Sequence, residues 1–482
     1  MRLVYLISIF LASFNLANSS EFFKDISNQI LNQGDRLSYG VAVSDTNNDG
    51  NYEFIVTGFG NKNLALSSAN GKLINVAKSK VFTDREKLTI GVASCDIDGD
   101  GFEEIYFLNT DTYSGVKRYS DRLIDLKNNK YIDLFEQEIN KENLNLTAGR
   151  SVACVDRKGD GMYGFYVANY GGPTRFYEMS DKKIIDIASE LGLDKITGGR
   201  SVVSGHILSN KIDIFAANER GSNFLYKNVD GIYFDMAASQ RVLDTYQNGR
   251  GTVLSDILYR GSLDIINGNW DGYHRLFVKR ENFFEDIAAS PFNTPSKIRT
   301  VISADFDNDG FDEVFMNNIG EPNKLFKILN NGKVKEVPIK TALEPNGLGT
   351  GAAVADIDND GILELLISHG EVGLQKLTLY KANIDKKKNF IRIKPLNKNG
   401  APARGATVTL ISNKRKHAKT IDSGSGYLCQ MEPVAHYGIR DKEKDFLVKI
   451  RWTNGEENTY KINEVGKTYT CLLYTSPSPR DS

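Results

Sequence analysis

The sequence predicts an all-β protein, a seven-bladed β-propeller followed by a small β domain. One strand-like segment recurs along the chain, for example as RSVACVD (150–156), RGTVLSD (250–256) and RTVISAD (299–305). The positions that end this segment are 45, 96, 156, 206, 256, 305 and 356, so the repeat length lies between 49 and 60 residues. A period near 50 residues with several short strands per unit is typical of propeller blades. Seven copies therefore predict seven blades.

A second recurring motif predicts how the ring closes. An apolar pair, an acid, an apolar residue and a small residue follow one another at 22–27, 184–189, 233–239 and 283–290, and we interpret this motif as the outermost strand of a blade. The seventh blade, which starts at Gly351, lacks the motif, whereas the copy at 22–27 precedes the first blade. We therefore expect the N-terminal strand to complete the seventh blade and to hide the open strand edges.

Four of the copies continue into an acidic loop, as in DFDNDGFDEVFM (305–316). An EF-hand needs a glutamate at loop position 12, but that position holds Met316 here and is apolar in the other three loops. Position 9 is a glutamate in all four loops, and the flanking segments alternate as strands do. The loop therefore joins two strands and offers oxygens from positions 1, 3, 5 and 9 to one hard cation.

We predict calcium in these loops, about four Ca²⁺ ions in all, because calcium accepts many flexible oxygen ligands and magnesium requires stricter geometry. The predicted ligands are Asp45, Asn47, Asp49 and Glu53; Asp96, Asp98, Asp100 and Glu104; Asp305, Asp307, Asp309 and Glu313; and Asp356, Asp358, Asp360 and Glu364. The alternative is a set of Asx-turns with solvated carboxylates. The ions would chiefly brace the loops, and a direct bridge from calcium to a ligand is the second interpretation.

Three blades have lost the loop chemistry. The loop of blade three has Lys158 at position 3 and Gly164 at position 9. The loop of blade four has His206 at position 1, and the loop of blade five has Arg260 at position 5. We expect no calcium in these blades.

Two further sets of polar residues recur in the repeat. Arg150, Arg200, Arg250 and Arg299 enter the innermost strand of four consecutive blades. They would form a basic collar for an anion, or each would pair with a carboxylate or carbonyl of a neighbouring blade, which is the more common arrangement. Asparagines that follow the second strand suit turns. They are Asn109, Asn169, Asn218, Asn269 and Asn318. Trp270 beside them suits either sugar binding or blade packing.

The two ends of the chain differ in composition from the repeats between them. Arg2, the apolar run at 3–14 and the small residues of ANS at 17–19 predict a signal peptide cleaved after Ser19, the alternative being a retained anchor helix. The last residues, LLYTSPSPRDS (472–482), fit neither blade nor strand patterns, and we interpret them as a non-native tail.

The four cysteines are too few for a disulfide-stapled fold. Cys95 and Cys154 stand one and two residues before aligned aspartates, so they face opposite sides of equivalent strands, and we expect both to be buried free thiols. Cys429 and Cys471 are a candidate pair, which the position of Cys471 beside the tail weakens.

The repeats resemble FG-GAP and VCBS repeats of integrin-like propellers over residues 21–388. GAPARGATVTLIS (400–412), SGSGYLCQMEPVAHYGI (423–439) and VKIRWTNGEE (448–457) resemble the ASPIC and UnbV domain, which follows such repeats in the family of cartilage acidic protein and its bacterial relatives. The resemblance implies a secreted, calcium-binding, extracellular protein. The expected division is a signal peptide at 1–19, a propeller at 20–388, an ASPIC/UnbV-like domain at 389–471 and the tail at 472–482.

The net charge and the absence of known catalytic motifs limit the classes of function to expect. A net charge of −1 gives no reason to expect nucleic acid as a partner. The five histidines are scattered, and the chain has no HExxH, P-loop or dinucleotide fingerprint. We therefore expect a non-enzymatic binding or adhesion module that is secreted, or periplasmic in a bacterial host, and whose partner is an extracellular protein or glycan. The alternatives are a lectin or a carbohydrate-active enzyme that uses the channel mouth.

Overall fold

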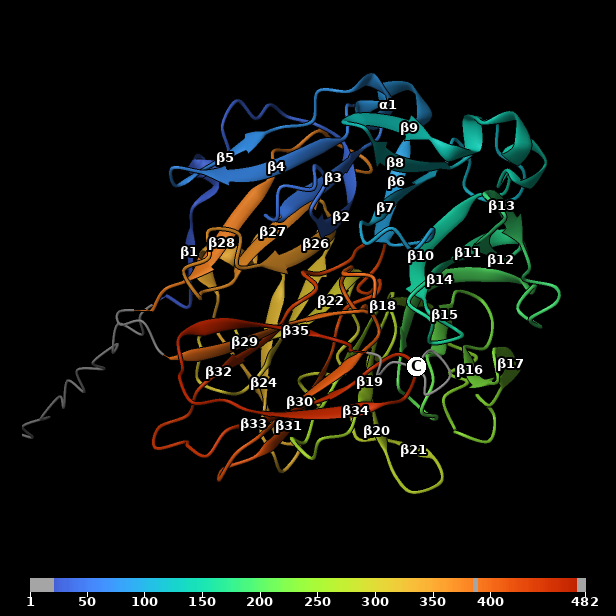
Figure 1. Ribbon diagram of the computed structural model, residues 1–482. Helices are drawn as coiled ribbons and strands as arrows, with labels where there is room; N and C mark the ends of the chain where they lie inside the picture. The colour runs from blue at the N-terminus through green and yellow to red at the C-terminus, as the bar shows by residue number, and fades with distance from the viewer. Residues whose placement is uncertain (1–20, 385–388, 475–482) are drawn as a thin grey trace, which may run out of the picture.

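The computed structural model describes residues 21–384 and 389–474, and it confirms the predicted all-β propeller. The predicted signal peptide and residues 475–482 of the predicted tail lie outside this range. The described residues form seven blades of antiparallel strands that run outward from a central channel, and a pairing between β11 and β14 joins blades three and four into one sheet (Figure 1). Residues after the seventh blade form two further sheets.

The four strand positions of a blade recur in order. The innermost strands are β2 (Ser38–Ser44), β6 (Thr89–Cys95), β10 (Gly149–Val155), β14 (Ile196–Gly205), β18 (Gly249–Ser255), β22 (Ile298–Ala304) and β26 (Gly349–Ala355). The second strands are β3 (Glu53–Gly58), β7 (Glu104–Asn109), β11 (Gly164–Pro173), β15 (Asp213–Asn218), β19 (Asp264–Asn269), β23 (Glu313–Asn318) and β27 (Glu364–His369). The third strands are β4 (Leu64–Ala69), β8 (Arg122–Lys127), β12 (Arg175–Ser180), β16 (Phe224–Val229), β20 (Arg275–Lys279), β24 (Lys324–Ile328) and β28 (Thr378–Ala382). The outer strands are β5 (Lys72–Asn75), β9 (Lys130–Asp133), β13 (Lys183–Asp186), β17 (Ile232–Asp235), β21 (Phe284–Asp286) and β25 (Val334–Glu336), with β1 (Phe23–Asp25) in the seventh blade. A short helix, α1 (Lys80–Thr83), follows β5.

The ring closes as the recurring motif predicts. Strand β1 pairs antiparallel with β28, with Phe23 opposite Ala382 and Asp25 opposite Tyr380 (Figure 1). Phe23 is fully buried and packs edge-on against Phe306 of blade six. The seventh blade is thus built from both ends of the propeller, which leaves no unpaired outer edge on β28.

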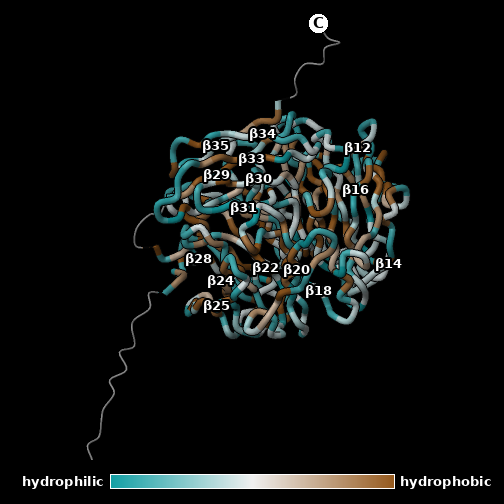
Figure 2. Tube along the Cα trace, turned by 90° about the horizontal axis from the view of Figure 1, so that it is seen from below, coloured by the Kyte–Doolittle hydropathy of each residue, from teal (hydrophilic) through white to brown (hydrophobic). Residues whose placement is uncertain are grey.

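The core lies between the faces of neighbouring blades. The innermost and second strands are buried on both faces, so they read as nearly continuous apolar runs, for example VASC in β6 and IYFL in β7. Side chains of consecutive blades share one large cluster that spans the ring closure, to which blade six contributes Phe315, blade seven Leu366 and blade one Val56. Hydrophobic segments accordingly lie within the mass of strands, and hydrophilic segments follow the outer turns (Figure 2).

The C-terminal sheets are made of the remaining strands. Their bounds are β29 (Phe390–Leu396), β30 (Thr407–Ile411), β31 (Lys416–Thr420), β32 (Ala435–Gly438), β33 (Leu447–Arg451), β34 (Glu457–Lys461) and β35 (Lys467–Leu472). One sheet has the order β32-β29-β35 and the other β31-β30-β33-β34. Trp452 is fully buried in the core between them. Leu473 is also buried there, and its N–H bonds the carbonyl of Leu396.

The structure corrects the prediction that Cys95 and Cys154 are free. They form a disulfide between β6 and β10, with their Cα atoms 6.2 Å apart. The two cysteines do face opposite sides of equivalent strands, but blades stack face to face, so opposite faces of consecutive blades meet. Cys429 and Cys471, the candidate pair, are both buried and unpaired.

Removing this disulfide with Cys95→Ser/Cys154→Ser should lower the free energy of unfolding by about 2–4 kcal/mol, because the bond closes a long loop in the unfolded chain. Denaturant unfolding measures the change. Cys471→Ser, which breaks no crosslink, is the control. Equal midpoints for the double variant and the control would contradict a native disulfide.

Among the described residues, no helix has both the length and the apolar character needed to cross a membrane.

Candidate metal centres

The aspartate that opens each acidic loop holds the turn together through both carboxylate oxygens. Asp305 follows β22, and it accepts the N–H of Asp309 at 3.0 Å on Oδ1 and the N–H of Gly310 at 2.9 Å on Oδ2. The loops that begin at Asp45 and Asp356 are built in the same way. Gly310 has a φ of +84°, a left-handed conformation that favours glycine and explains the G of the motif.

The glutamate at position 9 joins the loop to the second strand. Glu313 begins β23, and its Oε2 accepts the N–H of Phe306 at 3.1 Å. The same bond runs from Thr46 to Glu53 at 2.9 Å, from Ile97 to Glu104 at 2.8 Å and from Ile357 to Glu364 at 2.9 Å. Among the described residues, the Oε1 atom of Glu53 is buried and accepts no hydrogen bond, whereas the Oε1 atoms of Glu313 and Glu364 lie against the ammonium groups of Lys327 and Lys381. A buried acceptor in this position is costly, which favours a cation as its partner.

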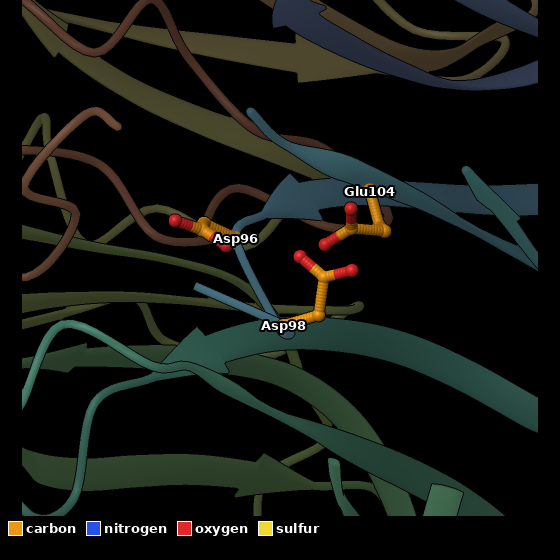
Figure 3. A group of neighbouring side chains, drawn as sticks. All are labelled: Asp96, Asp98 and Glu104. Carbon is orange, nitrogen blue, oxygen red and sulfur yellow. The ribbon is translucent and has the colours of Figure 1, made fainter. Parts of the chain in front are cut away.

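Carboxylates converge in three of the four predicted loops. Within the described residues, the groups whose oxygens all lie within 4.8 Å of one another are Asp96, Asp98 and Glu104; Asp305, Asp307 and Glu313; and Asp356, Asp358 and Asp360. In blade two, Asp98 and Glu104 turn their carboxylates towards one another (Figure 3). The first loop, in which Asn47 replaces an acid, is not among these groups, and Asp100, Asp309 and Glu364 lie outside them.

Burial disfavours the ionised form of these carboxylates. Burial is the main cause of each pKa shift, and it raises the pKa of Asp96 to about 7 and that of Glu53 to about 7. It raises the pKa of Glu364 to about 8 although the neighbouring Lys381 opposes the shift, and Asp358 adds a repulsive charge. Burial and neighbouring acids also raise the pKa of Glu104 well above its ordinary value. A divalent cation would stabilise the ionised form of all of them.

A lysine on the third strand contacts the acidic cluster in each of the three blades, but its place differs. Lys327 lies opposite Glu313 on β24, with its Nζ 3.1 Å from Glu313 Oε1, and Lys381 lies in the same place opposite Glu364. Each ammonium neutralises part of the cluster that it contacts. In blade two the buried Asp125 takes this place, and Lys127, two residues further along β8, lies 3.0 Å from Asp98 Oδ2 and 2.8 Å from Asp125 Oδ2. The oxygen donors of all three clusters fit a hard divalent cation, and in blade two the charge of Asp125 offsets that of the lysine.

The three divergent loops have exchanged ligand chemistry for contacts with the C-terminal sheets. Asp156 of blade three accepts the hydroxyl hydrogen of Thr453 at 2.6 Å. His206 of blade four lies 2.9 Å from the Thr407 hydroxyl, and Asp256 of blade five accepts the N–H of Ala418 at 3.0 Å. The C-terminal domain therefore contacts the first residue of each divergent loop.

The C-terminal domain packs on the face of the propeller that carries the loops. It reaches blade six through the N–H of Gly438, which Asp305 accepts at 2.8 Å, and blade seven through Arg392, which pairs with Asp356. It reaches blade three through Asn397, which donates to the carbonyl of Gly161 at 3.1 Å. The predicted calcium ligands Asp305 and Asp356 therefore also anchor this domain.

One segment of the C-terminal domain, residues 422–432, enters the central channel, and we call it the plug. Its backbone bonds the inner edges of several innermost strands: Gly426 exchanges two bonds of 2.7 Å with Thr252 of β18, and Ser423 accepts the N–H of Cys154 of β10 at 2.7 Å. Gln430 bonds Val41 of β2 at 3.0 Å. The sequence showed SGSGYLCQME only as a motif of a following domain, because a channel-filling role depends on contacts far apart in the chain.

The plug is fixed at its base by Arg404, which is fully buried. Its Nη1 donates to the carbonyls of Asp422 at 2.7 Å and Met431 at 3.3 Å, the two ends of the plug. Its Nη2 donates to the carbonyl of Val43 at 3.0 Å and its Nε pairs with Glu103. Arg404 therefore ties the plug to the first two blades.

The arginine ring lies at the opposite mouth of the channel, where the innermost strands begin. Arg250 pairs with Glu219 of blade four and Arg299 with Glu371 of blade seven, partners in a neighbouring blade as the commoner interpretation predicted, whereas Arg200 pairs with Glu219 of its own blade. The recurring asparagines take the predicted turn role. Their side chains are buried, and four donate to the carbonyl four residues ahead, which are those of Asn169, Asn218, Asn269 and Asn318.

Comparison with known proteins matches both parts of the chain. Residues 305–367 match the family described as FG-GAP-like repeat, and residues 396–474 match ASPIC and UnbV. Among solved structures, a lectin from Burkholderia pseudomallei aligns with a TM-score of 0.48 and 12% identity, covering 72% of this chain and 99% of that chain, a similarity too low to bear on function.

Two curated relatives are far more similar. "Cartilage acidic protein 1" of Xenopus tropicalis is 43% identical over 93% of this chain and 75% of its own length. The protein of the same name from Homo sapiens is 44% identical over 87% of this chain and 69% of its own length. The chain therefore belongs to the cartilage acidic protein 1 family.

Proposed function

We propose that the chain is a secreted, calcium-binding propeller that acts as a non-enzymatic binding or adhesion module outside the cell or in the cell envelope. In this proposal residues 20–388 are the propeller and 389–471 the ASPIC/UnbV-like domain, preceded by a signal peptide at 1–19. The observation that carries it is the convergence of three carboxylates in each of the loops that begin at Asp96, Asp305 and Asp356. Calcium there would offset repulsion among buried charges and brace the turns.

The compartment is supported by the disulfide and by the relatives. A disulfide between Cys95 and Cys154 suits an oxidising environment, which is also where calcium reaches millimolar levels. The partner in this proposal is an extracellular protein or glycan, in keeping with the cartilage acidic protein 1 relatives.

Calcium acts on the domain interface in this proposal. Asp305 and Asp356 belong to predicted calcium loops and at the same time hold Gly438 and Arg392 of the C-terminal domain. An ion that orders these two loops therefore also orders the surface on which that domain rests. In this proposal the partner binds a surface that the two domains form together, and the two domains are held as one rigid unit.

A lectin or a carbohydrate-active enzyme at the channel mouth has less support. Trp270 is the aromatic side chain there that best suits a sugar ring, but the guanidinium groups of Arg250 and Arg299 lie 5.0 Å and 4.6 Å from its ring centroid. These cations occupy the position in which a neutral sugar would stack.

Calcium titration of chelator-treated protein tests the proposal. Asp98→Asn should remove one bound ion, because Asp98 is one of three converging acids in blade two. The matched control is Asp160→Asn, which changes the same residue type in the divergent loop of blade three and should leave the number of ions unchanged. Each ion contributes about 1.4 kcal/mol of stability at tenfold excess over its dissociation constant. Equal calcium binding by the two variants would refute the assignment.

A further inference from the structure

A cavity of about 500 Å³ lies at the mouth of the channel opposite the calcium loops. The four arginines of the ring line it, and the plug forms its floor with Tyr427 and Leu428. Tyr113 also lines it and is 57% exposed, so the cavity opens to solvent there. Its volume falls in the range of small-molecule sites.

The cavity is lined by four guanidinium groups, but in the described part of the chain only two carboxylates pair with them. Glu219 bonds Arg200 at 2.6 Å and lies 3.1 Å from Arg250, and Glu371 pairs with Arg299. The remaining acid of the lining, Asp111, pairs with Arg118 outside the ring. Within the described residues, no acid pairs with Arg150, which donates instead to the carbonyls of Tyr113, Thr112 and Gly149. Four arginines thus share two carboxylates, a balance that attracts an anion.

The arginines are buried and held in place, which makes this a built site. Arg250 and Arg299 are only 6% and 7% exposed, and among the described residues their Nε atoms have no hydrogen-bond partner. Both guanidinium planes lie near the rings of Trp270 and Tyr427, at distances of 4.6 to 6.0 Å to the ring centroids. Buried donors without acceptors are costly, so an incoming oxygen would gain hydrogen bonds that the protein does not supply.

The positive charges of the four arginines also act on the phenol of Tyr427. Burial alone would raise the pKa of its phenol, but the field of Arg200, Arg250, Arg150 and Arg299 outweighs burial and lowers it to about 7. Its oxygen accepts a hydrogen bond from Arg200 Nη1 at 3.3 Å. Besides the four arginines, the titratable groups that line the cavity with it are Tyr39, Asp111, Tyr113, Glu219 and Glu371. A phenol from the plug is therefore itself drawn towards the anionic form.

We propose that this cavity binds a small oxyanion, a carboxylate, sulfate or phosphate group carried on a compact molecule, between Arg150, Arg250 and Arg299. Arginine presents donors in a planar fork that matches such groups. The site belongs to both domains, because the propeller supplies the arginines and the plug supplies the floor. It lies on the face opposite the calcium loops and does not depend on the proposed calcium function.

Tryptophan fluorescence provides the test. The chain has two tryptophans, of which Trp270 lines the cavity and Trp452 is buried in the C-terminal core, so a ligand changes the signal of one only. Sodium sulfate, sodium phosphate and sodium glucuronate are titrated at constant ionic strength against chloride. At least one should give a saturable change with a dissociation constant of about 1 mM or lower, and the three arms identify the preferred group. Trp270→Phe should abolish the change.

Three variants decide whether the arginines bind the anion. Arg150→Gln should weaken binding about tenfold or more, the loss expected for one charge-assisted contact. Arg280→Gln, which removes an arginine paired with Glu285 near the outer strand, should have no effect. Glu371→Gln removes a competing carboxylate and should tighten binding, a gain that misfolding cannot produce. No response to any probe, equal binding by the Arg150 and Arg280 variants, or unchanged binding by Glu371→Gln would overturn the proposal. Asp98→Asn should bind the anion normally, which separates this result from the calcium result.

Discussion

Arg404→Ala is expected to lower the free energy of unfolding by about 3–5 kcal/mol, because it leaves Glu103 as a buried, unpaired charge. The substitution also removes donors from three carbonyls, those of Asp422, Met431 and Val43. The first two are the ends of the plug, so the loss should loosen the plug as well as the interface between the domains. Equilibrium unfolding in denaturant measures the change, and Tyr427 absorbance reports the plug separately.

A matched arginine of the same domain provides the control. Arg451 pairs with Glu457 at 2.7 Å, but both side chains are about one third exposed, so Arg451→Ala should cost less than about 1 kcal/mol. Adding Glu103→Gln to Arg404→Ala should restore part of the lost stability, because the charge left behind is then neutral. A cost for Arg404→Ala no larger than that for Arg451→Ala would show that the buried pair does not join the domains.

Chelating calcium should lower the melting temperature, and the drop should be larger at pH 8 than at pH 6. In the metal-free protein, burial raises the pKa of Asp96 and Glu53 to about 7 and that of Glu364 to about 8. A carboxyl whose pKa is higher in the folded than in the unfolded state binds its proton more tightly when folded. Stability is therefore lost as the pH rises from the unfolded pKa, near 4, through the folded value.

Bound calcium takes the place of those protons, so the calcium-loaded protein should not show this loss. Paired melts in calcium and in EDTA, at pH 6 and pH 8 and fixed ionic strength, measure the difference. At a hundredfold excess over the dissociation constant, each ion adds about 2.7 kcal/mol. A drop of the same size at both pH values would mean that the buried carboxylates are not the calcium ligands.

The sequence predicts most of the propeller because each blade repeats the same local pattern. Seven copies of the innermost strand, the alternation around the acidic loops and the spare motif at 22–27 indicate blade number and ring closure without any long-range information. The predicted ligands of a loop are equally local: Asp305, Asp307 and Glu313 lie within nine residues of one another, and their carboxylates converge in the structure.

What the sequence does not predict depends on contacts between distant segments. The Cys95–Cys154 bond requires knowing which faces of neighbouring blades meet. Lys327 and Lys381 reach the acidic clusters from the third strand, and nothing in the loop motif indicates that a lysine side chain lies there. The partners of the arginine ring, Glu219 and Glu371, follow the second strand of blades four and seven, and Tyr427 comes from the other domain.

The calcium bound per purified chain is the measurement that tests the central claim most directly. We expect about four ions after dialysis against calcium, with blade two holding its ion most tightly, because Asp125 offsets the charge of Lys127 there, whereas Lys327 and Lys381 contact the position-9 glutamates of blades six and seven directly. The Asp98→Asn protein should hold one fewer. A chain that binds no calcium, and whose melting temperature is the same in calcium and in EDTA, would show that the loops are turns only and would contradict the calcium-braced propeller.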